Sequence, residues 1–490
     1  MRSALALLCA AAVPGVLLGQ PTQALQPETK PRLIVLTDIG NEPDDQMSMV
    51  RLMLYSNEID IEGLVATTST WQGTSTRPDT IRTIVADYGK VRSNLMLHAQ
   101  GWPRADDLAA RIFTGQPAYG IAAVGTDRMS DGARAIVASA DRADARPVWI
   151  SIWGGANTLA AALAHVRATR TAAETAAFVG KLRVYSISDQ DDAGAWIRRE
   201  FPALFYIVSP SSQDAGDYAY ATWTGISGDV LYRNGDGADG STVTNEWLER
   251  HVRNKGPLSR HYLRFEYIME GDTPAFLGLT NNGLASAVDP GWGGWGGRYV
   301  LRQPFGETRP IWTQGGDEGS RLTSRDTVVG QDGRVHVSDQ ATIWRWRSAF
   351  QNDFAARMDW TVRPYAKANH QPVAVVNGIG GTAPIVVSVA AGQRVTLDAG
   401  KSSDPDGDRL TYRWFHYREA GPGPETDRLD VDIAGADQPV AVVTASRCRR
   451  GWHDAQGACN RGAVAHIILQ VTDGGEPALT SYRRVILQTN

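Results

Sequence analysis

The residues best able to do chemistry lie in a turn that directly follows the apolar run at 33–36. The turn reads Thr37-Asp38-Ile39-Gly40-Asn41-Glu42-Pro43-Asp44-Asp45. Its carboxylates repel one another unless a cation lies among them, and no lysine or arginine occurs between Arg32 and Arg51. A hard divalent cation with oxygen ligands would supply that charge, and Ca²⁺ tolerates irregular carboxylate geometry best. The alternative is a turn whose aspartates only cap the following helix.

Such a turn must be held by a strand before it and a helix after it. Buried parallel strands are predicted from apolar runs at 33–36, 61–66, 94–98, 147–152, 182–187 and 204–208. Helical patterns lie at 44–56, 77–91, 130–141, 156–168 and 192–200. This alternation predicts a doubly wound α/β domain over residues 30–365, in which ligands bind beyond the carboxyl ends of the strands. Residues 210–250, rich in Gly, Asp, Ser and Tyr, predict loops that shape a site.

The composition changes near residues 366–372. Beyond this point, short alternating segments at 385–389, 394–397, 410–414 and 466–471 are separated by turn residues. They predict a small β-sandwich over 372–490. The turn from Asp404 to Asp408 could bind Ca²⁺, but it lacks the later ligands of an EF-hand loop, so a plain Asx turn is favoured.

The first residues have the pattern of a secretory signal. Arg2 precedes an apolar run from Ala4 to Leu18, and a Thr22-Gln23-Ala24 cleavage site follows, so residues 1–24 are predicted to be removed. The run is too short to span a membrane stably, and no later segment approaches about 20 apolar residues. We therefore expect a secreted or periplasmic protein without a membrane span.

Charge and cysteine content narrow the partners further. The net charge of -4 and the lack of a Lys/Arg-dense tract argue against a nucleic-acid polymer as a partner. After removal of the signal, Cys448 and Cys459 remain, and two cysteines in an exported protein predict a disulfide. A metal pair or a catalytic thiol would need a partnering His/Cys cluster, which is missing. The oligomeric state is left open.

The carboxylate turn resembles a known family. Thr37-Asp38-x-Gly40 followed by Asp44-Asp45 is similar to the calcium motif of nucleoside hydrolases, although five residues intervene here instead of three. The longer form resembles the nucleoside-hydrolase-like domain of a secreted bacterial family described as cellulose-binding. The Asp404 turn and the later Val471-Thr472-Asp473-Gly474 resemble PKD-like and cadherin-like modules.

Further segments fall in the order that this resemblance requires, over about residues 30–300. They are 62–71 (second strand, with Thr70 or Trp71 at a substrate position), 98–103 (third strand and loop), 153–160 and 270–275. The resemblance implies a Ca²⁺ site formed by Asp38, Asp44, Asp45, Asp272 and the backbone carbonyl of Trp153. It also implies that Asn157 contacts the substrate.

The implied reaction is a single displacement at a sugar carbon. Asp38 would take a proton from the attacking water, which predicts inversion of configuration. The histidine that precedes the late aspartate in nucleoside hydrolases is absent, and Glu270 is the nearest acid. A glutamic acid with a raised pKa can protonate a sugar-oxygen leaving group, so Glu270 is predicted to be the general acid.

Two further groups of residues are predicted to contact the sugar. Asp191 and Asp192 follow the predicted strand at 182–187, where they could bind sugar hydroxyls or serve as the acid. Asp192 could instead cap the helix at 192–200. Among fifteen tryptophans, Trp71 and the Gly-flanked Trp292 and Trp295 are predicted to stack on sugar rings.

Together these features predict a calcium-dependent glycosidase that acts on an extracytoplasmic carbohydrate. Two alternatives remain open. One is a nucleoside N-ribohydrolase, and the other is a non-catalytic carbohydrate-binding (cellulose-binding) protein that kept the metal site to hold sugar hydroxyls.

Overall fold

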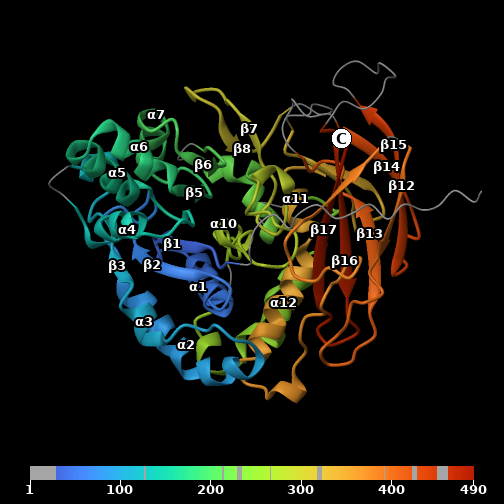
Figure 1. The fold of residues 1–490 in the computed structure, drawn as a ribbon. Coiled ribbons are helices and arrows are strands. Elements are labelled where there is room, and N and C mark those ends of the chain that lie inside the picture. The colour runs from blue at the N-terminus through green and yellow to red at the C-terminus, as the bar shows by residue number, and fades with distance from the viewer. Residues whose placement is uncertain are drawn as a thin grey trace, which may run out of the picture.

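A mostly parallel eight-stranded sheet forms the centre of the N-terminal part of the protein (Figure 1). The computed structural model describes residues 29–125, 129–211, 215–228, 234–264, 266–316, 323–390, 392–421, 428–449 and 462–489. The strand order is β3-β2-β1-β4-β5-β6-β8-β7, and only β7 runs antiparallel to its neighbour. The strands are β1 (Arg32–Thr37), β2 (Asp60–Ala66), β3 (Ile112–Thr114), β4 (Val148–Ile152), β5 (Leu182–Ser186), β6 (Phe205–Val208), β7 (Val300–Arg302) and β8 (Ile311–Thr313).

Helices cover both faces of this sheet, and each face has its own apolar core. One face packs against α1 (Pro43–Tyr55), α2 (Pro78–His98), α10 (Pro274–Leu277) and α12 (Arg347–Asp359). The other packs against α4 (Asp131–Asp141), α5 (Asn157–Thr169), α6 (Ala172–Gly180) and α7 (Ala193–Glu200). Shorter helices are α3 (Ala105–Ala109), α8 (Asn245–Leu248), α9 (Gly256–Ser259) and α11 (Ala341–Trp344). The predicted doubly wound α/β fold is confirmed.

The chain reverses its winding direction at β1. This strand pairs in parallel with β2 on one side and with β4 on the other. In sheets of this kind the carboxyl ends of the strands beside such a reversal leave a crevice for ligands. The turn with the clustered carboxylates begins at this point, directly after Thr37.

The predicted third strand at 94–98 is wrong. These residues form the last turn of α2, in which Leu95 is buried while Met96 and Leu97 are 43% and 56% exposed. The apolar run was therefore a helix end with two solvent-facing apolar side chains. The actual third strand, β3, has only three residues, too few to give a periodic signal.

The C-terminal part is all-β, as predicted. Its strands are β11 (Ile385–Val389), β12 (Arg394–Asp398), β13 (Thr411–His416), β14 (Arg428–Ala434), β15 (Val440–Arg449), β16 (Val464–Thr472) and β17 (Thr480–Thr489). All seven enclose a single apolar core, and one parallel bridge between Arg428 and Val464 joins β14 to β16. The Oδ1 atom of Asp404 accepts hydrogen bonds from the backbone amides of Asp406 and Asp408, which is the favoured Asx turn.

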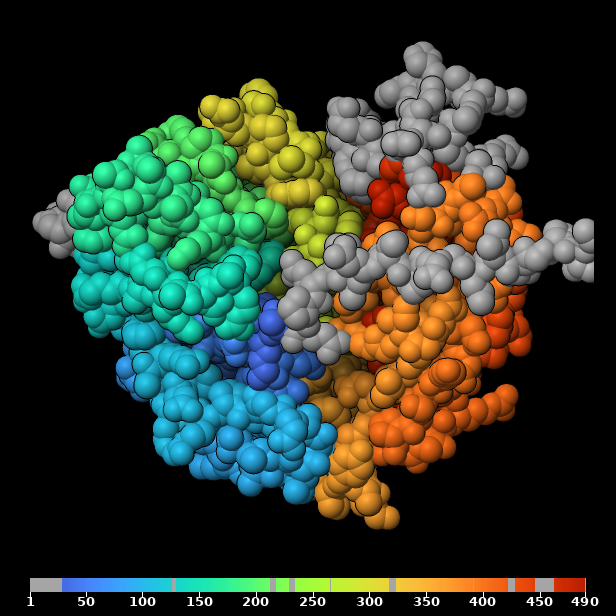
Figure 2. Space-filling model, in the orientation of Figure 1, coloured from blue at the N-terminus to red at the C-terminus, as the bar shows by residue number. Residues whose placement is uncertain are grey.

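The two parts lie side by side (Figure 2) and are joined by direct contacts. Arg484 of β17 donates hydrogen bonds to the backbone carbonyls of Leu284, Trp292 and Gly293 at 2.7–3.0 Å. Gly283 approaches β17 so closely that a Cβ there would lie 1.9 Å from the carbonyl oxygen of Tyr482. The Gly-rich loop around residues 291–299 is therefore covered by the all-β part.

Two predictions fall outside what the structure describes. Residues 1–24 and Cys459 lie outside the described residues, as does the side chain of Cys448, so the signal peptide and the disulfide stay predictions. Within the ranges given above, no helix is both long enough and apolar enough to cross a membrane.

Candidate functional site

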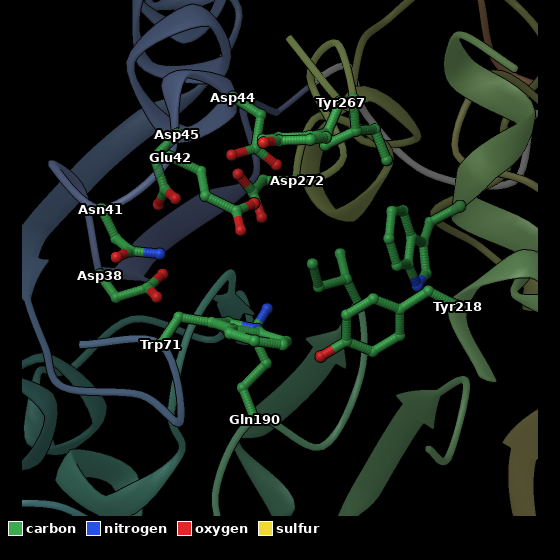
Figure 3. Close-up of a pocket in the computed structure, with 13 residues that line it drawn as sticks. Asp38, Asn41, Glu42, Asp44, Asp45, Trp71, Gln190, Tyr218, Tyr267 and Asp272 are labelled. Atoms are coloured by element: carbon green, nitrogen blue, oxygen red, sulfur yellow. The ribbon is translucent and has the colours of Figure 1, made fainter. Parts of the chain in front are cut away.

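A cavity of about 240 Å³ lies at the carboxyl ends of β1, β2 and β5. Acidic side chains gather on one side of it, with Trp71 and Gln190 beneath them and Tyr218 facing them across the space (Figure 3). Its lining residues are Asp38, Asn41, Glu42, Asp44, Asp45, Trp71, Ile187, Gln190, Tyr218, Trp223, Tyr267, Ile268 and Asp272.

Local sequence places the first acids at the cavity. Gly40, at φ +99°, lets the chain turn sharply after β1, and Pro43 then starts α1, where its missing N–H costs nothing. Asp44 and Asp45 thus fall in the first turn of α1, where the helix dipole favours negative charge. The alternative, that the aspartates cap this helix, does not describe the turn: the N-cap position is held by Glu42, whose side chain makes no cap hydrogen bond, and Asp44 and Asp45 lie inside the helix.

Asp272 joins this turn from a distant part of the chain. Asp44, Asp45 and Asp272 each offer one carboxylate oxygen, and these three oxygens lie within 4.8 Å of one another. The Oδ2 atom of Asp272 is buried and has no hydrogen-bond partner among the described residues. A buried carboxylate oxygen without a donor is costly, unless a cation satisfies it.

The electrostatics of the cluster point the same way. Burial raises the pKa values of Asp44, Asp45 and Asp272 well above the ordinary value of 3.8, and repulsion from the neighbouring carboxylates raises them further. Glu42 contributes to that repulsion in all three cases. No Lys, Arg or His is among the described residues that line the cavity. The donor set therefore fits a hard divalent cation such as Ca²⁺.

Asp38 lies in the same cavity but outside the group of three. Its Oδ2 atom accepts a hydrogen bond from the Ser69 hydroxyl at 2.5 Å, and its backbone carbonyl accepts one from the Gln72 amide at 3.1 Å. Burial raises the pKa of Asp38 to about 6, and the Ser69 hydrogen bond opposes that rise. A carboxylate with a pKa in this range can accept a proton near neutral pH.

The Trp153 segment is adjacent to these acids. A Cβ added to Gly154 would lie 2.7 Å from the Oδ1 atom of Asp38, so the backbone here passes directly beside that carboxylate. The Trp153 carbonyl accepts a hydrogen bond from the Gln190 side-chain amide at 2.8 Å and has a second lone pair. Its role as a calcium ligand stays a prediction.

The structure contradicts the predicted role of Glu270 as general acid. Its side chain is completely buried, does not line the cavity, and is paired with Arg51 at 2.5 and 3.1 Å. Tyr262 and Thr273 donate further hydrogen bonds to the same carboxylate. Glu270 therefore has a structural role, and it cannot reach a leaving group in the cavity.

Three further predicted sugar contacts are not among the residues lining the cavity. Asn157 is fully buried and its side-chain amide donates to Thr68 and to the Ala118 carbonyl. Asp191 accepts hydrogen bonds from the backbone amides of Asn157 and Ala193, and Asp192 accepts one from Ile121. These side chains hold loops together. Asp192 occupies the N-cap position of α7, but its side chain makes no cap hydrogen bond, so the capping alternative is wrong for this side chain.

The predicted exposure of Trp292 and Trp295 is also wrong. Both are at least 91% buried between the two parts of the protein, Trp292 against His466 and Trp295 against Phe350 and Tyr482. Their flanking glycines allow close packing rather than exposure. Trp71, in contrast, lines the cavity and is 39% exposed.

Eight lining residues were not predicted as site residues from the sequence: Asn41, Glu42, Ile187, Gln190, Tyr218, Trp223, Tyr267 and Ile268. Glu42 and Gln190 lie close in sequence to the predicted site residues Asp44 and Asp191. The sequence therefore indicated the correct segments, but not these two side chains. Tyr218 lies in the 210–250 region that was predicted to shape a site. Tyr267 lies in a loop without any distinguishing pattern.

The comparisons with known proteins agree with the observed fold. The family described as "Cellulose-binding Sde182, nucleoside hydrolase-like domain" matches residues 32–299, and "Cellulose-binding protein Sde0182, C-terminal domain" matches residues 394–489. A solved nucleoside hydrolase-related hypothetical protein from Saccharophagus degradans, associated with carbohydrate metabolism, is 33% identical with a TM-score of 0.76. That match covers 94% of this chain and 100% of the other.

The remaining similarities are weak. The effector protein XOO4466 is 12% identical, with a TM-score of 0.34, over 69% of this chain and 95% of its own. A similarity at that level carries no argument about the site. No curated protein matches the sequence.

Proposed function

Because the chain belongs to the cellulose-binding Sde182 family, with its nucleoside-hydrolase-like domain, we propose that it hydrolyses glycosidic bonds in a neutral carbohydrate with the help of Ca²⁺. One observation carries this proposal above the others. Three buried carboxylates converge within 4.8 Å, and one of their oxygens has no partner among the described residues. This arrangement supports a cation site at the bottom of a cavity that also presents an aromatic face.

Asp44, Asp45 and Asp272 would hold the cation, with Asp38 and the Trp153 carbonyl beside them. A bound Ca²⁺ would lower the pKa of a water molecule and would position sugar hydroxyls. The ion would also neutralise part of the repulsion that raises the pKa values of these acids.

Asp38 is the base in this proposal. Its Oδ2 atom is occupied by Ser69, which leaves Oδ1 to receive the proton of the attacking water. As the bond to the leaving group breaks, positive charge develops on the sugar, and the surrounding carboxylates stabilise it. Attack by water in one step inverts the anomeric carbon.

With Glu270 excluded, Glu42 becomes the candidate general acid. It lines the cavity and lies outside the group of three metal-binding aspartates. A Glu42→Gln variant should lose activity on substrates with poor leaving groups, yet keep most of it on p-nitrophenyl glycosides, which need no protonation. Equal loss on both kinds of substrate would exclude Glu42 as the acid.

The cavity favours a neutral sugar. A phosphate or uronate group would meet five acidic side chains and, among the described lining residues, no basic one. Trp71 and Tyr218 offer apolar ring faces of the kind that sugar rings stack on. Together with the family description, this supports a β-glucan as the first substrate to test.

Carbohydrate binding without catalysis is the second candidate. This candidate is favoured by the position of Glu270, which is too far from the cavity to act as a general acid. The carboxylate cluster and the aromatic face would still be enough to bind a sugar. A nucleoside N-ribohydrolase remains the third. The predicted signal peptide supports an extracytoplasmic location for all three.

One panel separates the candidates. Wild-type protein and Asp38→Asn, each with Ca²⁺ or with EDTA, would be tested for reducing-sugar release from cellulose, cello-oligosaccharides and other neutral glycans, for inosine cleavage, and for glycan binding. Calcium-dependent release that is lost in Asp38→Asn supports the glycosidase. Binding without release in wild type supports the binding protein, and inosine cleavage alone supports the nucleosidase. Failure of Ca²⁺ to bind in calorimetry would overturn the metal site.

A further inference from the structure

Ser69 lies between Asp38, on the acidic side of the cavity, and Trp71, on its aromatic side. It lies just beyond β2, and its side chain is completely buried. The hydroxyl lies 2.5 Å from Oδ2 of Asp38, 3.0 Å from the backbone nitrogen of Trp71 and 3.1 Å from that of Gln72. One side chain therefore contacts both the acidic and the aromatic side of the site.

The chemistry of a hydroxyl fixes the direction of these bonds. Serine has one hydrogen to donate and two lone pairs that accept. The backbone amides of Trp71 and Gln72 can only donate, so they fill the two acceptor positions of Ser69. The single hydroxyl hydrogen must then point at Oδ2 of Asp38. The one hydrogen and both lone pairs of the hydroxyl are then used, and no other arrangement satisfies all three partners.

The turn that carries Trp71 is attached to the site at further points. Within the turn, the backbone amide of Ser69 donates to the Gln72 carbonyl at 3.2 Å. The amide of Thr70 donates to the Gln190 carbonyl at 2.6 Å, and the Gln72 side chain donates to the Asp38 carbonyl at 3.1 Å. The indole of Trp71 then projects along the cavity, with its ring centre 6.4 Å from that of Tyr218 (Figure 3).

We propose that Ser69 is a positioning residue that sets the Asp38 carboxylate and the Trp71 sugar platform relative to each other. The inference rests on the proposed function, because it takes Asp38 as the base and Trp71 as the surface on which the sugar stacks. A sugar that stacks on Trp71 is then held in register with the reactive oxygen of Asp38. A change at Ser69 should disturb both partners at once.

A double-mutant cycle tests this role. Affinity for a thio-linked cellotetraose, whose sulfur linkages resist hydrolysis, would be measured by calorimetry in Ca²⁺ buffer for wild type, Ser69→Ala, Trp71→Ala and the double variant. We expect Ser69→Ala to weaken binding about fivefold to tenfold, the size of one or two lost hydrogen bonds, but less than twofold when Trp71 is already absent. Equal loss in both backgrounds would show that Ser69 does not act through Trp71 and would overturn the proposal.

Ser139→Ala is the matched control. Ser139 is also a buried serine whose hydroxyl donates to a carboxylate, that of Glu62, but it lies near the opposite ends of the strands. It should leave affinity for the thio-linked cellotetraose unchanged. Ser69→Thr, which keeps the hydroxyl, should restore most of the affinity lost in Ser69→Ala. A Thr variant as weak as the Ala variant, in a fold that melts as wild type does, would also count against the proposal.

A ligand-free measurement separates this inference from the proposed function. In protein labelled with 5-fluorotryptophan, the ¹⁹F resonance of Trp71 can be assigned with Trp71→Phe. Ser69→Ala should shift or broaden that resonance, and Ser139→Ala should not. If wild type binds no glycan, the proposed function fails, yet the resonance still decides whether Ser69 positions Trp71. An unchanged Trp71 resonance in Ser69→Ala would overturn the inference itself.

Discussion

Glu270 and Asp272 stand two residues apart and are both fully buried carboxylates, but their surroundings differ completely. The carboxylate of Glu270 accepts hydrogen bonds from the side chains of Arg51, Tyr262 and Thr273, and Arg51 also balances its charge. Asp272 faces other carboxylates, and repulsion adds to burial to hold its pKa well above the usual value. Glu270 therefore stabilises the fold, whereas the carboxylate of Asp272 is placed to bind a cation.

The same contrast appears between two larger regions. Asp326 lies between the two parts of the protein, where Arg298, Arg345 and Tyr417 donate to it. These partners hold its pKa below the ordinary value although the group is fully buried. The cavity aspartates Asp38, Asp44, Asp45 and Asp272 are also buried, but no arginine is among the described residues that line the cavity, and the pKa values of these four rise. An arginine partner therefore distinguishes Glu270 and Asp326 from the cavity aspartates.

The largest expected effect comes from removing an arginine in the structural region. Arg51→Met would leave Glu270 as an unpaired buried charge, and we expect the free energy of unfolding to fall by about 3–5 kcal/mol. Chemical denaturation with Ca²⁺ present would measure this loss. Adding Glu270→Gln should restore part of it, because the stranded charge is gone. A loss below about 1 kcal/mol would mean that Glu270 does not need its arginine.

The second largest expected effect is the stabilisation of the fold by a Ca²⁺ ion bound among the cavity aspartates. If Ca²⁺ binds only the folded protein, a concentration one hundred times the dissociation constant should stabilise it by about 2.7 kcal/mol. Calorimetric melting with Ca²⁺ or EDTA would show the difference. Asp272→Asn should abolish it, whereas Asp79→Asn, at an exposed aspartate of α2, should not. A calcium response that survives in Asp272→Asn would place the ion elsewhere.

The two regions should also respond to pH with opposite signs. Because burial raises the pKa of Asp38 from 3.8 to about 6, the folded state holds that proton more tightly than the unfolded state. Its contribution to stability is full below pH 4 and is lost as the pH rises through 6, by up to about 3 kcal/mol. Asp326, with its lowered pKa, contributes above pH 4 and loses that contribution as the pH falls.

Denaturation in EDTA between pH 4 and 7 would test the difference in sign. Stability should fall with rising pH more steeply in wild type than in Asp38→Asn. Saturating Ca²⁺ should remove most of the difference, because the cation favours the ionised carboxylates. Parallel pH profiles for the two proteins in EDTA would contradict the raised pKa of Asp38.

The smallest expected effect on stability is at the half-exposed aromatic face. Trp71→Ala should change the free energy of unfolding by less than about 0.5 kcal/mol, as for other surface substitutions. It should nevertheless weaken glycan binding about tenfold, through the loss of a stacking surface. Trp295→Phe, at a buried tryptophan that does not line the cavity, should leave glycan affinity unchanged. Affinity measurements on the two variants would distinguish a tryptophan that contacts the glycan from one that only packs inside the protein.

The sequence predicted the strand–turn–helix unit around Asp38 well, because its apolar run, Gly40 and Pro43 are local signals. It also placed Asp272 correctly, although only through a family resemblance. Glu270 and Asp272 could not be told apart, because what distinguishes them is Arg51, more than two hundred residues away in the chain. The burial of Trp292 could not be predicted either, because the surface that covers it belongs to the all-β part.

Arg484 gives the all-β part a role in the stability of the whole protein. Its guanidinium is buried and satisfies three backbone carbonyls of the α/β part. An α/β part expressed alone would expose those carbonyls together with the apolar faces of Trp292 and Trp295. The two parts should therefore melt in one cooperative transition. The C-terminal part is better regarded as half of one folding unit than as an accessory module that could be exchanged between enzymes.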